Sequence, residues 1–257
     1  MVFILSAWNG WAQQDTITGE TKKIKTLSEQ TERSHLQKTM LKRKKLSHFR
    51  GNWEGLYLGF MDFGNTDYTE YGGNDFLNLD MAGSVVVQWN VESFALPLYR
   101  NFGIVSGVGL EYQRMRFNRD ITLRKDERGD LQPLVLSDIG IERVKRSSFK
   151  ILYLTLPLLV EYQFNPKERR PLYVSVGIVG GLRLHSKTKV VYKSEAGNKR
   201  KRKESGSYNM LPVKADAMVR LGLFGVNVWG SYSLTPLFDT GCAPKVHPYA
   251  IGFGFTF

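Results

Sequence analysis

From Trp53 to the C-terminal Phe257, apolar and polar residues alternate along the chain in stretches of the length of a β-strand. A period of two places successive side chains on opposite faces of a strand, so each stretch has one apolar and one polar face. In residues 148–164, for example, an apolar face that includes Leu154 alternates with a polar face that includes Glu161. Eight such strands are predicted, over residues 53–64, 84–99, 102–118, 148–164, 172–187, 213–223, 226–237 and 247–257.

The connections between these strands alternate between short and long. The short ones are residues 100–101, 165–170 and 224–225, and the long ones are residues 65–83, 119–147, 194–207 and 238–246. This alternation is typical of an up-and-down barrel in an outer membrane, where periplasmic turns are short and external loops are long. It predicts that both ends of the barrel chain lie on the periplasmic side. A soluble barrel of the lipocalin type would not need this asymmetry.

The polar face of the strands indicates which side of the barrel meets lipid. It carries charged residues and many glycines, whereas the other face is rich in Leu, Val and Phe. Side chains just fill the interior of an eight-stranded barrel, so small residues and paired charges suit it better than bulky apolar ones. We therefore predict an all-β fold, an eight-stranded antiparallel up-and-down transmembrane β-barrel over residues 51–257, with its apolar face toward lipid. Candidates for interfacial aromatic girdles are Tyr112, Tyr162, Phe164, Tyr232 and Tyr249.

Composition favours a barrel over membrane-spanning helices. Hydrophobic residues make up 42% of the 257 residues, but there is no run of about 18 or more apolar residues. A transmembrane helix needs about 20 such residues, and an open sheet would leave unpaired backbone groups in lipid, so only a closed barrel could span a membrane. The single cysteine, Cys242, excludes an intramolecular disulfide and a cysteine-based zinc site. No metal site and no cofactor are predicted.

A group of charged residues falls on the predicted inward face. Its members are Glu111, Glu161, Arg183, Lys214, Asp216 and Arg220. Buried charges must be paired whether or not they carry out chemistry, so a structural salt-bridge network is favoured over a relay or a binding site. His185 falls on the same face and, without a second histidine nearby, is interpreted as solvated or hydrogen-bonded rather than as a metal ligand or catalytic base. No G-x-S-x-G elbow, P-loop or H-E-x-x-H motif occurs, and no catalytic residue is assigned.

The net charge of +12 is concentrated in two segments. Residues 21–50 contain ten Lys or Arg against two Glu. The second segment is the run Lys199, Arg200, Lys201, Arg202 and Lys203. Two basic clusters would suit nucleic acid, but no aromatic residues interleave with the second run and no recognition-helix pattern follows it. We interpret the two segments as a solvated tail and a solvated loop, and predict no nucleic-acid partner. The basic loop would attract anionic partners such as lipopolysaccharide phosphates.

The first residues have features of a secretory signal. A short apolar run over residues 2–8 precedes small residues that predict cleavage near Ala12, although no Lys or Arg comes before the run. We predict a signal peptide, complete or truncated, over residues 1–13, with a buried N-terminal strand as the alternative. Residues 14–50 are predicted to be a basic periplasmic linker. A short amphipathic helix in contact with anionic lipid is a less favoured interpretation of the same residues.

Four segments resemble the outer-membrane β-barrel proteins of Bacteroidetes, the porin-family or PorT-like group. They are residues 53–60 (WEGLYLGF), 102–111 (FGIVSGVGLE), 154–162 (LTLPLLVEY) and 252–257 (GFGFTF). The resemblance extends over about four fifths of the chain, and the Ala12–Gln13 junction is similar to signal cleavage sites of that group. It implies no agreed catalytic residues. It also implies that the last strand is a signal for the outer-membrane assembly machinery, carried by Tyr249, Phe253, Phe255 and Phe257.

The predicted function is that of an integral outer-membrane barrel without enzymatic activity, which serves envelope structure, surface interaction or anchoring through its long external loops. Its predicted partners are outer-membrane lipid, lipopolysaccharide and the assembly machinery. A narrow pore or small-ligand transporter is one alternative, although a bare eight-stranded barrel lacks an open aqueous channel. A lipid-modifying enzyme is another, because Ser186, His185 and His247 are available near the outer rim. A soluble lipocalin-like binder is the last.

Overall fold

The computed structural model describes most of the chain from Phe49 onward and three residues before it. The described residues are 31–32, 34, 49–69, 76–126, 128–141, 143–168, 170–194, 198–239, 241 and 243–257. The chain divides into two units, Met1–His48 and Phe49–Phe257. The predicted signal peptide, most of the predicted linker and Cys242 lie outside the described residues. No helix in the described part of the chain is long and apolar enough to cross a membrane.

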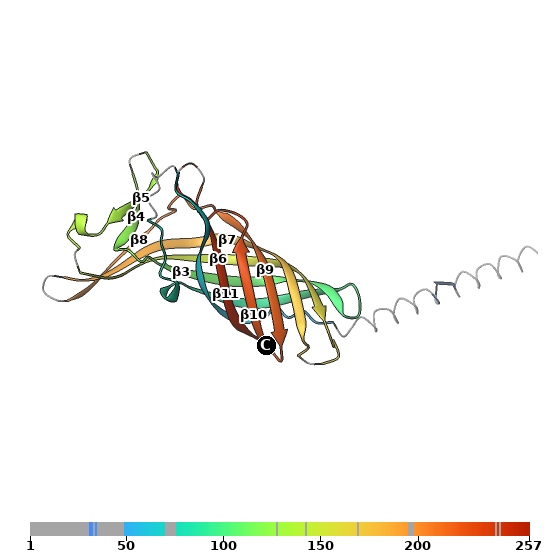
Figure 1. Ribbon diagram of the computed structural model, residues 1–257. Coiled ribbons are helices and arrows are strands. Elements are labelled where there is room, and N and C mark those ends of the chain that lie inside the picture. The colour runs from blue at the N-terminus through green and yellow to red at the C-terminus, as the bar shows by residue number, and fades with distance from the viewer. Residues whose placement is uncertain are drawn as a thin grey trace, which may run out of the picture. The chain divides into compact units, whose positions relative to one another are not determined.

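Eight strands form a closed antiparallel barrel, because each strand pairs with its two neighbours in the ring and the last pairs with the first (Figure 1). In ring order they are β1 (Gly55–Asp67), β2 (Val85–Pro97), β3 (Phe102–Arg116), β6 (Val144–Gln163), β7 (Tyr173–Lys193), β9 (Val213–Leu223), β10 (Val226–Ser233) and β11 (Lys245–Thr256). The predicted fold is confirmed. The observed strands differ from the predicted ones most in length: β6 has 20 residues and β7 has 21, and both are longer than predicted.

The barrel closes where β1 pairs with β11, as predicted for the first and last strands. The register along this seam is continuous from Gly55 to Gly64, and in its middle Gly59 lies opposite Gly252. A Cβ atom on Gly252 would lie 2.0 Å from the carbonyl oxygen of Leu58, much closer than real Cβ atoms approach other atoms. The close approach of the two strands therefore requires glycine at this position.

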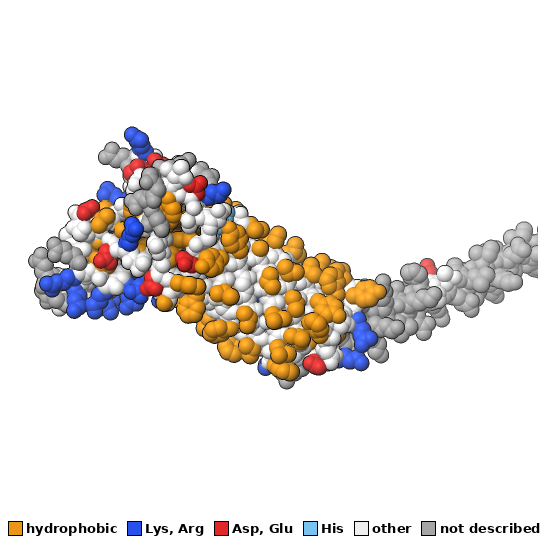
Figure 2. Space-filling view, viewed as in Figure 1, with side chains coloured by type: hydrophobic (Ala, Val, Ile, Leu, Met, Phe, Trp, Pro, Cys, Tyr) orange, Lys and Arg blue, Asp and Glu red, His pale blue; other side chains and the backbone are white. Residues whose placement is uncertain are grey.

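The apolar face of the strands points outward and the charged face points inward, as predicted. On β6, Leu158 is 63% exposed, whereas Glu161 on the opposite face is fully buried. Figure 2 shows the outward side chains on one side of the barrel as a band of hydrophobic groups. Such a band suits the hydrocarbon interior of a bilayer, because apolar surface gains about 25 cal/mol per Å² when it leaves water.

The two ends of the barrel have different connections, as the alternating lengths predict. At one end the links are short, and Phe224 and Gly225, with φ angles of 54° and 86°, form the two-residue hairpin turn between β9 and β10. The opposite end carries longer links with additional structure, and Figure 1 shows β4, β5 and β8 gathered there, away from the C-terminus. These links contain η2 (Met81–Gly83), β4 (Ile121–Lys125), β5 (Leu131–Val135), η3 (Ser137–Ile139) and β8 (Lys199–Ser205).

The basic cluster at residues 199–203 forms a strand, so its prediction as a loop is wrong. It belongs to β8, which pairs antiparallel with residues 187–193 of β7. The difference arises because β7 continues to Lys193 rather than ending at Lys187, and the backbone groups of this extension need hydrogen-bond partners. Every residue of β8 is exposed, so the strand leaves its charged side chains in water.

A β-bulge in β7 exchanges the inward and outward faces near one end of the barrel. The register of β7 against β6 shifts between Arg183 and His185. One extra residue in a strand moves every following side chain to the other face. The alternation predicts His185 and Lys187 on the inward face, and this is wrong: Ser186 is buried there, and His185 is exposed.

Candidate functional site in the barrel interior

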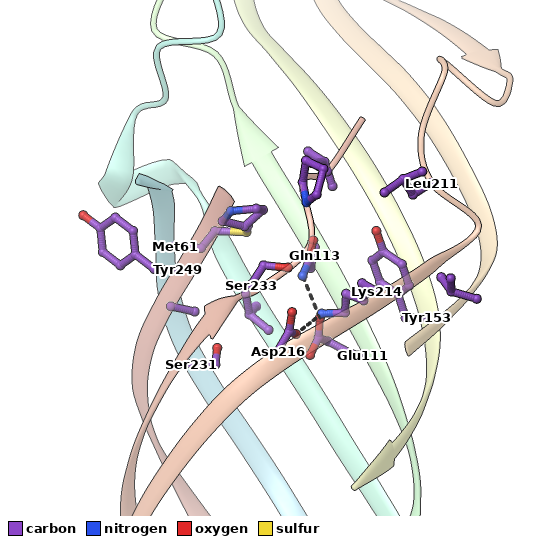
Figure 3. A pocket seen from close by; sticks show the side chains of 16 residues that line it. Met61, Glu111, Gln113, Tyr153, Leu211, Lys214, Asp216, Ser231, Ser233 and Tyr249 are labelled. Atoms are coloured by element: carbon purple, nitrogen blue, oxygen red, sulfur yellow. Dashed lines mark hydrogen bonds and ion pairs between the residues drawn. The ribbon is translucent and has the colours of Figure 1, made fainter. Parts of the chain in front are cut away.

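Within the barrel, Lys214 on β9 lies between two carboxylates (Figure 3). Its Nζ atom is 2.6 Å from Oε1 of Glu111 on β3 and also forms an ion pair with Oδ2 of Asp216. The side-chain amides of Gln88 and Gln113 donate hydrogen bonds to the Glu111 carboxylate, at 3.0 and 2.6 Å. We refer to Glu111, Lys214 and Asp216 as the lumen triad. The lumen triad joins β3 and β9, which are separated in the ring by β6 and β7.

The lumen triad is almost completely withdrawn from solvent, since none of its side chains is more than 9% exposed. It contains one cation and two anions, and the ammonium group also lies 4.7 Å from the ring centre of Tyr153. The Oδ1 atom of Asp216 has no hydrogen-bond partner among the described residues. An adjoining cavity of about 20 Å³ is large enough for a single water molecule. The triad is thus a packed ionic group rather than the lining of a passage.

Further along β9, aromatic rings enclose Arg220. Its guanidinium carbon lies 5.0 to 5.6 Å from the ring centres of Trp53, Tyr57 and Tyr173. Its Nη2 atom donates a hydrogen bond to the Tyr173 hydroxyl at 3.1 Å, and others to the Tyr57 hydroxyl and the backbone carbonyl of Asn52. Contacts between a cation and ring faces are worth about 2 kcal/mol when the cation is desolvated, and Arg220 is 1% exposed. We refer to this group as the arginine cage.

Glu161 on β6 is fully buried and is satisfied by neutral donors. Its Oε1 atom accepts hydrogen bonds from the side-chain amides of Asn52 and Gln163, both at 2.7 Å. Its Oε2 atom accepts one from the Ser175 hydroxyl at 2.9 Å. Among the described residues, no ion pair includes Glu161. Its negative charge is therefore stabilised by oriented dipoles and not by a direct cation.

The predicted charged residues consequently do not form one network. Three make up the lumen triad, while Glu161 and Arg220 lie outside it and are held by hydrogen bonds to neutral groups. Arg183 joins neither group, because its Nη1 atom donates to the backbone carbonyl of Ser207 at 2.8 Å in an exposed position. The prediction that Arg183 belongs to the charge network is wrong, because alternation gives the face of a side chain but not the residues that it meets across the lumen.

Large aromatic side chains fill much of the interior, contrary to the expectation of mainly small residues and charges. Tyr57, Tyr153 and Tyr173 are each 1% exposed. Two of them cover a glycine directly opposite on the neighbouring strand: a Cβ atom on Gly222 would lie 2.1 Å from Tyr173, and one on Gly254 would lie 2.5 Å from Tyr57. The inward glycines make room for these rings, and their position opposite tyrosines is the signal that the sequence contained.

The segment just before β1 enters the barrel and packs inside it. Phe49 is 5% exposed and Trp53 is 1% exposed, and both belong to the core cluster. Asn52 connects the two separately held charges, because its side chain bonds Glu161 and its carbonyl accepts from Arg220. The sequence predicts residues up to 50 as linker, because nothing in their alternation distinguishes this segment.

The predicted outward aromatic residues lie on the outer surface of the barrel. Tyr162, Phe164 and Tyr232 are exposed, and Tyr112 and Tyr249 are half-buried. On β11 and just after it, Phe253, Phe255 and Phe257 are each more than half exposed. Their action as an assembly signal stays a prediction. In the part of the chain that the structure describes, no group of three or more His, Cys, Asp or Glu side chains could hold a metal ion.

A closed antiparallel barrel with an apolar outer band and a polar, packed interior defines an integral membrane β-barrel. The chain belongs to the outer membrane protein beta-barrel domain family, whose model matches residues 48–239. It is accordingly a protein of the outer membrane. No curated protein matches the chain. Similar solved structures include Ail, the attachment invasion locus protein of Yersinia pestis, with 16% sequence identity and a TM-score of 0.31 over 79% of this chain and 97% of that chain.

Proposed function

We propose that this outer-membrane protein is a closed, non-enzymatic barrel that anchors an ordered surface structure. The observation that carries this proposal is the packed interior, in which the lumen triad, the arginine cage and the entering segment occupy the space along the barrel axis. An eight-stranded barrel has an interior just wide enough for side chains to fill. The barrel then serves as a rigid support, and contacts with other molecules fall to the parts that leave the membrane.

The length of the strands supports a projecting structure. A transmembrane β-strand needs about 9 to 11 residues, whereas β6 and β7 have 20 and 21. About half of each strand therefore extends past the bilayer, at the end that also carries β8 and the β4–β5 hairpin. The length asymmetry of the connections favours this end as the outer one. Paired strands give the external surface a defined shape, which suits recognition better than irregular loops do.

The closed barrel is expected to carry no steady ionic current. Because Trp53 and Arg220 are packed in the interior and each is 1% exposed, ions have no continuous water-filled route. Full-length protein reconstituted in planar lipid bilayers should give a flat trace at all voltages, compared with a trimeric porin as the conducting control. Stable, reproducible conductance steps would contradict the closed barrel and favour a narrow pore, for which the charged lumen triad would then be the selectivity element.

The hydrogen bonds of the candidate catalytic side chains favour a protein without lipid-modifying activity. Ser186 donates its hydroxyl to the backbone carbonyl of Gly206 at 2.6 Å, and Nδ1 of His247 lies 2.9 Å from the backbone carbonyl of Ser233. A nucleophile needs a base within hydrogen-bond reach, and these contacts are to the backbone instead. Lipid A and phospholipid profiles of a deletion strain should match those of the parent, and a missing or new acylated species would contradict this.

A finer affiliation accompanies this proposal. The segments that resemble the PorT-like, porin-family barrels of Bacteroidetes lie mainly on the wall of the barrel, on β1, β3, β6 and β11. We propose that the chain comes from that group, that a signal peptide directs its export, and that the aromatic end of β11 is read by the assembly machinery. Outer-membrane lipid and lipopolysaccharide are its proposed partners at the outer surface.

A further inference from the structure

A group of cations lies on the outward face of the barrel beyond the apolar band. They line a shallow hollow of about 80 Å³ that also includes Ser148. The cations come from three neighbouring strands and are Arg114, Arg116, Arg146, Lys150 and Lys189. Cross-strand pairing explains why they meet, because Arg114 lies opposite Lys150, and Ser148 lies opposite both Arg116 and Lys189.

Strand β8 widens this group on the far side of β7. Lys203 lies opposite Lys189, and Lys201 lies two residues further along the same face. The positive charge of Lys150 lowers the pKa of Lys189, with smaller effects from its partial desolvation and from Lys201, Lys203 and Arg146. We refer to these residues of β3, β6, β7 and β8 as the basic stripe. In Figure 2, Lys and Arg side chains gather where Figure 1 draws the end of the β7–β8 hairpin.

Apart from Arg116, the cations of the hollow are not neutralised by carboxylates among the described residues. Within the described residues, the ion pairs outside the lumen join Arg116 to Asp80 at 3.2 Å and Arg202 to Glu204 at 2.7 Å. Arg114, Arg146, Lys150 and Lys189 take part in none. Like charges opposite one another on neighbouring strands destabilise a sheet. A bound anion would offset this repulsion.

The position of the basic stripe indicates which anion it meets. The ammonium group of Lys150 lies 5.6 Å from the ring centre of Tyr112, a half-buried outward tyrosine. Directly beyond Tyr112, the outward residues of β3 and β6 are apolar, with Leu110 opposite Leu154. Aromatic residues of this kind mark the level where hydrocarbon gives way to headgroups. The hollow that contains Lys150 is therefore at the height of lipid headgroups, and the cations of β8 continue from it toward the external structure.

We propose that the basic stripe binds the phosphate groups of a phosphorylated saccharide lipid of the outer leaflet, such as lipid A. The proposal rests on the proposed orientation of the barrel, with the β7–β8 end outside the cell. Guanidinium and ammonium groups form strong charge-assisted hydrogen bonds with phosphate oxygens. Neighbouring strands are about 4.8 Å apart, so four strands span about 14 Å, which accommodates more than one phosphate group. The acyl chains of the same lipid would lie against the apolar band below.

The test measures the affinity of full-length protein in detergent micelles for bisphosphorylated lipid A, by thermophoresis. The variant K150Q/K189Q should raise the dissociation constant about tenfold or more, because it removes two charge-assisted contacts. The matched control R100Q/K167Q removes two exposed cations from the short-turn end of the barrel and should leave the constant unchanged. Lipid A without phosphates should bind wild-type protein as weakly as K150Q/K189Q binds the bisphosphorylated form.

Several results would overturn the proposal. One is an unchanged affinity of K150Q/K189Q for lipid A, and another is an equal loss of affinity in R100Q/K167Q. A third is that heparin binding, but not lipid A binding, depends on Lys150 and Lys189, which would assign the stripe to a soluble polyanion. R114Q/R146Q gives an independent test from the other side of the hollow, and a gel shift on boiling verifies folding of each variant. If wild-type protein gives a flat bilayer trace but K150Q/K189Q binds lipid A as tightly as wild type, the result contradicts lipid binding by the basic stripe and leaves the closed barrel in place. Conductance together with stripe-dependent lipid binding contradicts the closed barrel alone.

Discussion

Gly252→Val is expected to prevent the barrel from closing. Gly252 lies opposite Gly59 in the seam between β1 and β11, where an added Cβ atom would be 2.0 Å from the Leu58 carbonyl oxygen and 2.5 Å from Cα of Gly59. Both contacts are with backbone, which cannot rotate away as a flexible side chain could. We expect a loss of about 4 kcal/mol or more in the free energy of unfolding, a size reserved for severe disruptions of packing.

The matched control for this variant is Gly230→Val. Gly230 lies on the neighbouring strand β10, and the nearest atom to an added Cβ would be the Ala250 carbonyl oxygen at 3.9 Å. Refolding into lipid vesicles followed by electrophoresis with and without boiling measures both variants. Gly230→Val should shift on boiling like the wild type, and Gly252→Val should run at one position. A normal shift for Gly252→Val would mean that the seam is looser than the structure describes.

Lys214→Met is expected to destabilise the barrel by about 3 to 5 kcal/mol, because removing one partner of a buried ion pair leaves the other charge uncompensated. Here two carboxylates, Glu111 and Asp216, lose their common cation, and both side chains are less than 9% exposed. Unfolding by urea from lipid vesicles, followed by tryptophan fluorescence, measures the loss.

The comparison for Lys214→Met is the triple variant that also carries Glu111→Gln and Asp216→Asn. Replacing a whole buried ionic group by neutral residues of similar volume is often nearly neutral, so stability should return to within about 1 kcal/mol of the wild type. If Lys214→Met alone has no effect, the lumen triad contributes no net stability. If the triple variant is as unstable as the single one, packing of the lysine side chain and not its charge is what matters.

The wall of the barrel was predictable because lipid and a narrow lumen impose opposite demands on successive residues. Strand β6 shows this clearly, with Leu158 outward and Glu161 inward as the alternation requires. The seam was predictable too, because in a closed up-and-down barrel the first and last strands must pair.

Outside the membrane, the two faces of a strand no longer meet lipid on one side and the lumen on the other. Alternation therefore no longer predicts where strands form or which face is buried. Residues 199–203 form a strand although all of them are charged. Both faces of β8 meet water, so this strand needs no alternation of apolar and polar residues. The bulge before His185 changes the face of each residue after it without changing the composition. The arginine cage was not predictable for a different reason: Arg220 meets Trp53 and Tyr57 only through the register of β9 across the ring.

The hairpin of β7 and β8 has a consequence for crowding in the membrane. Within the described residues β8 pairs only with β7, so its other side presents unpaired backbone groups to the surroundings. Such an edge is a template on which another chain can add a strand, and lysine-rich edges resist this addition. With cations at Lys199 through Lys203, two copies that approach through this edge repel each other. The charges of β8 thus oppose the joining of two copies of this barrel through this edge.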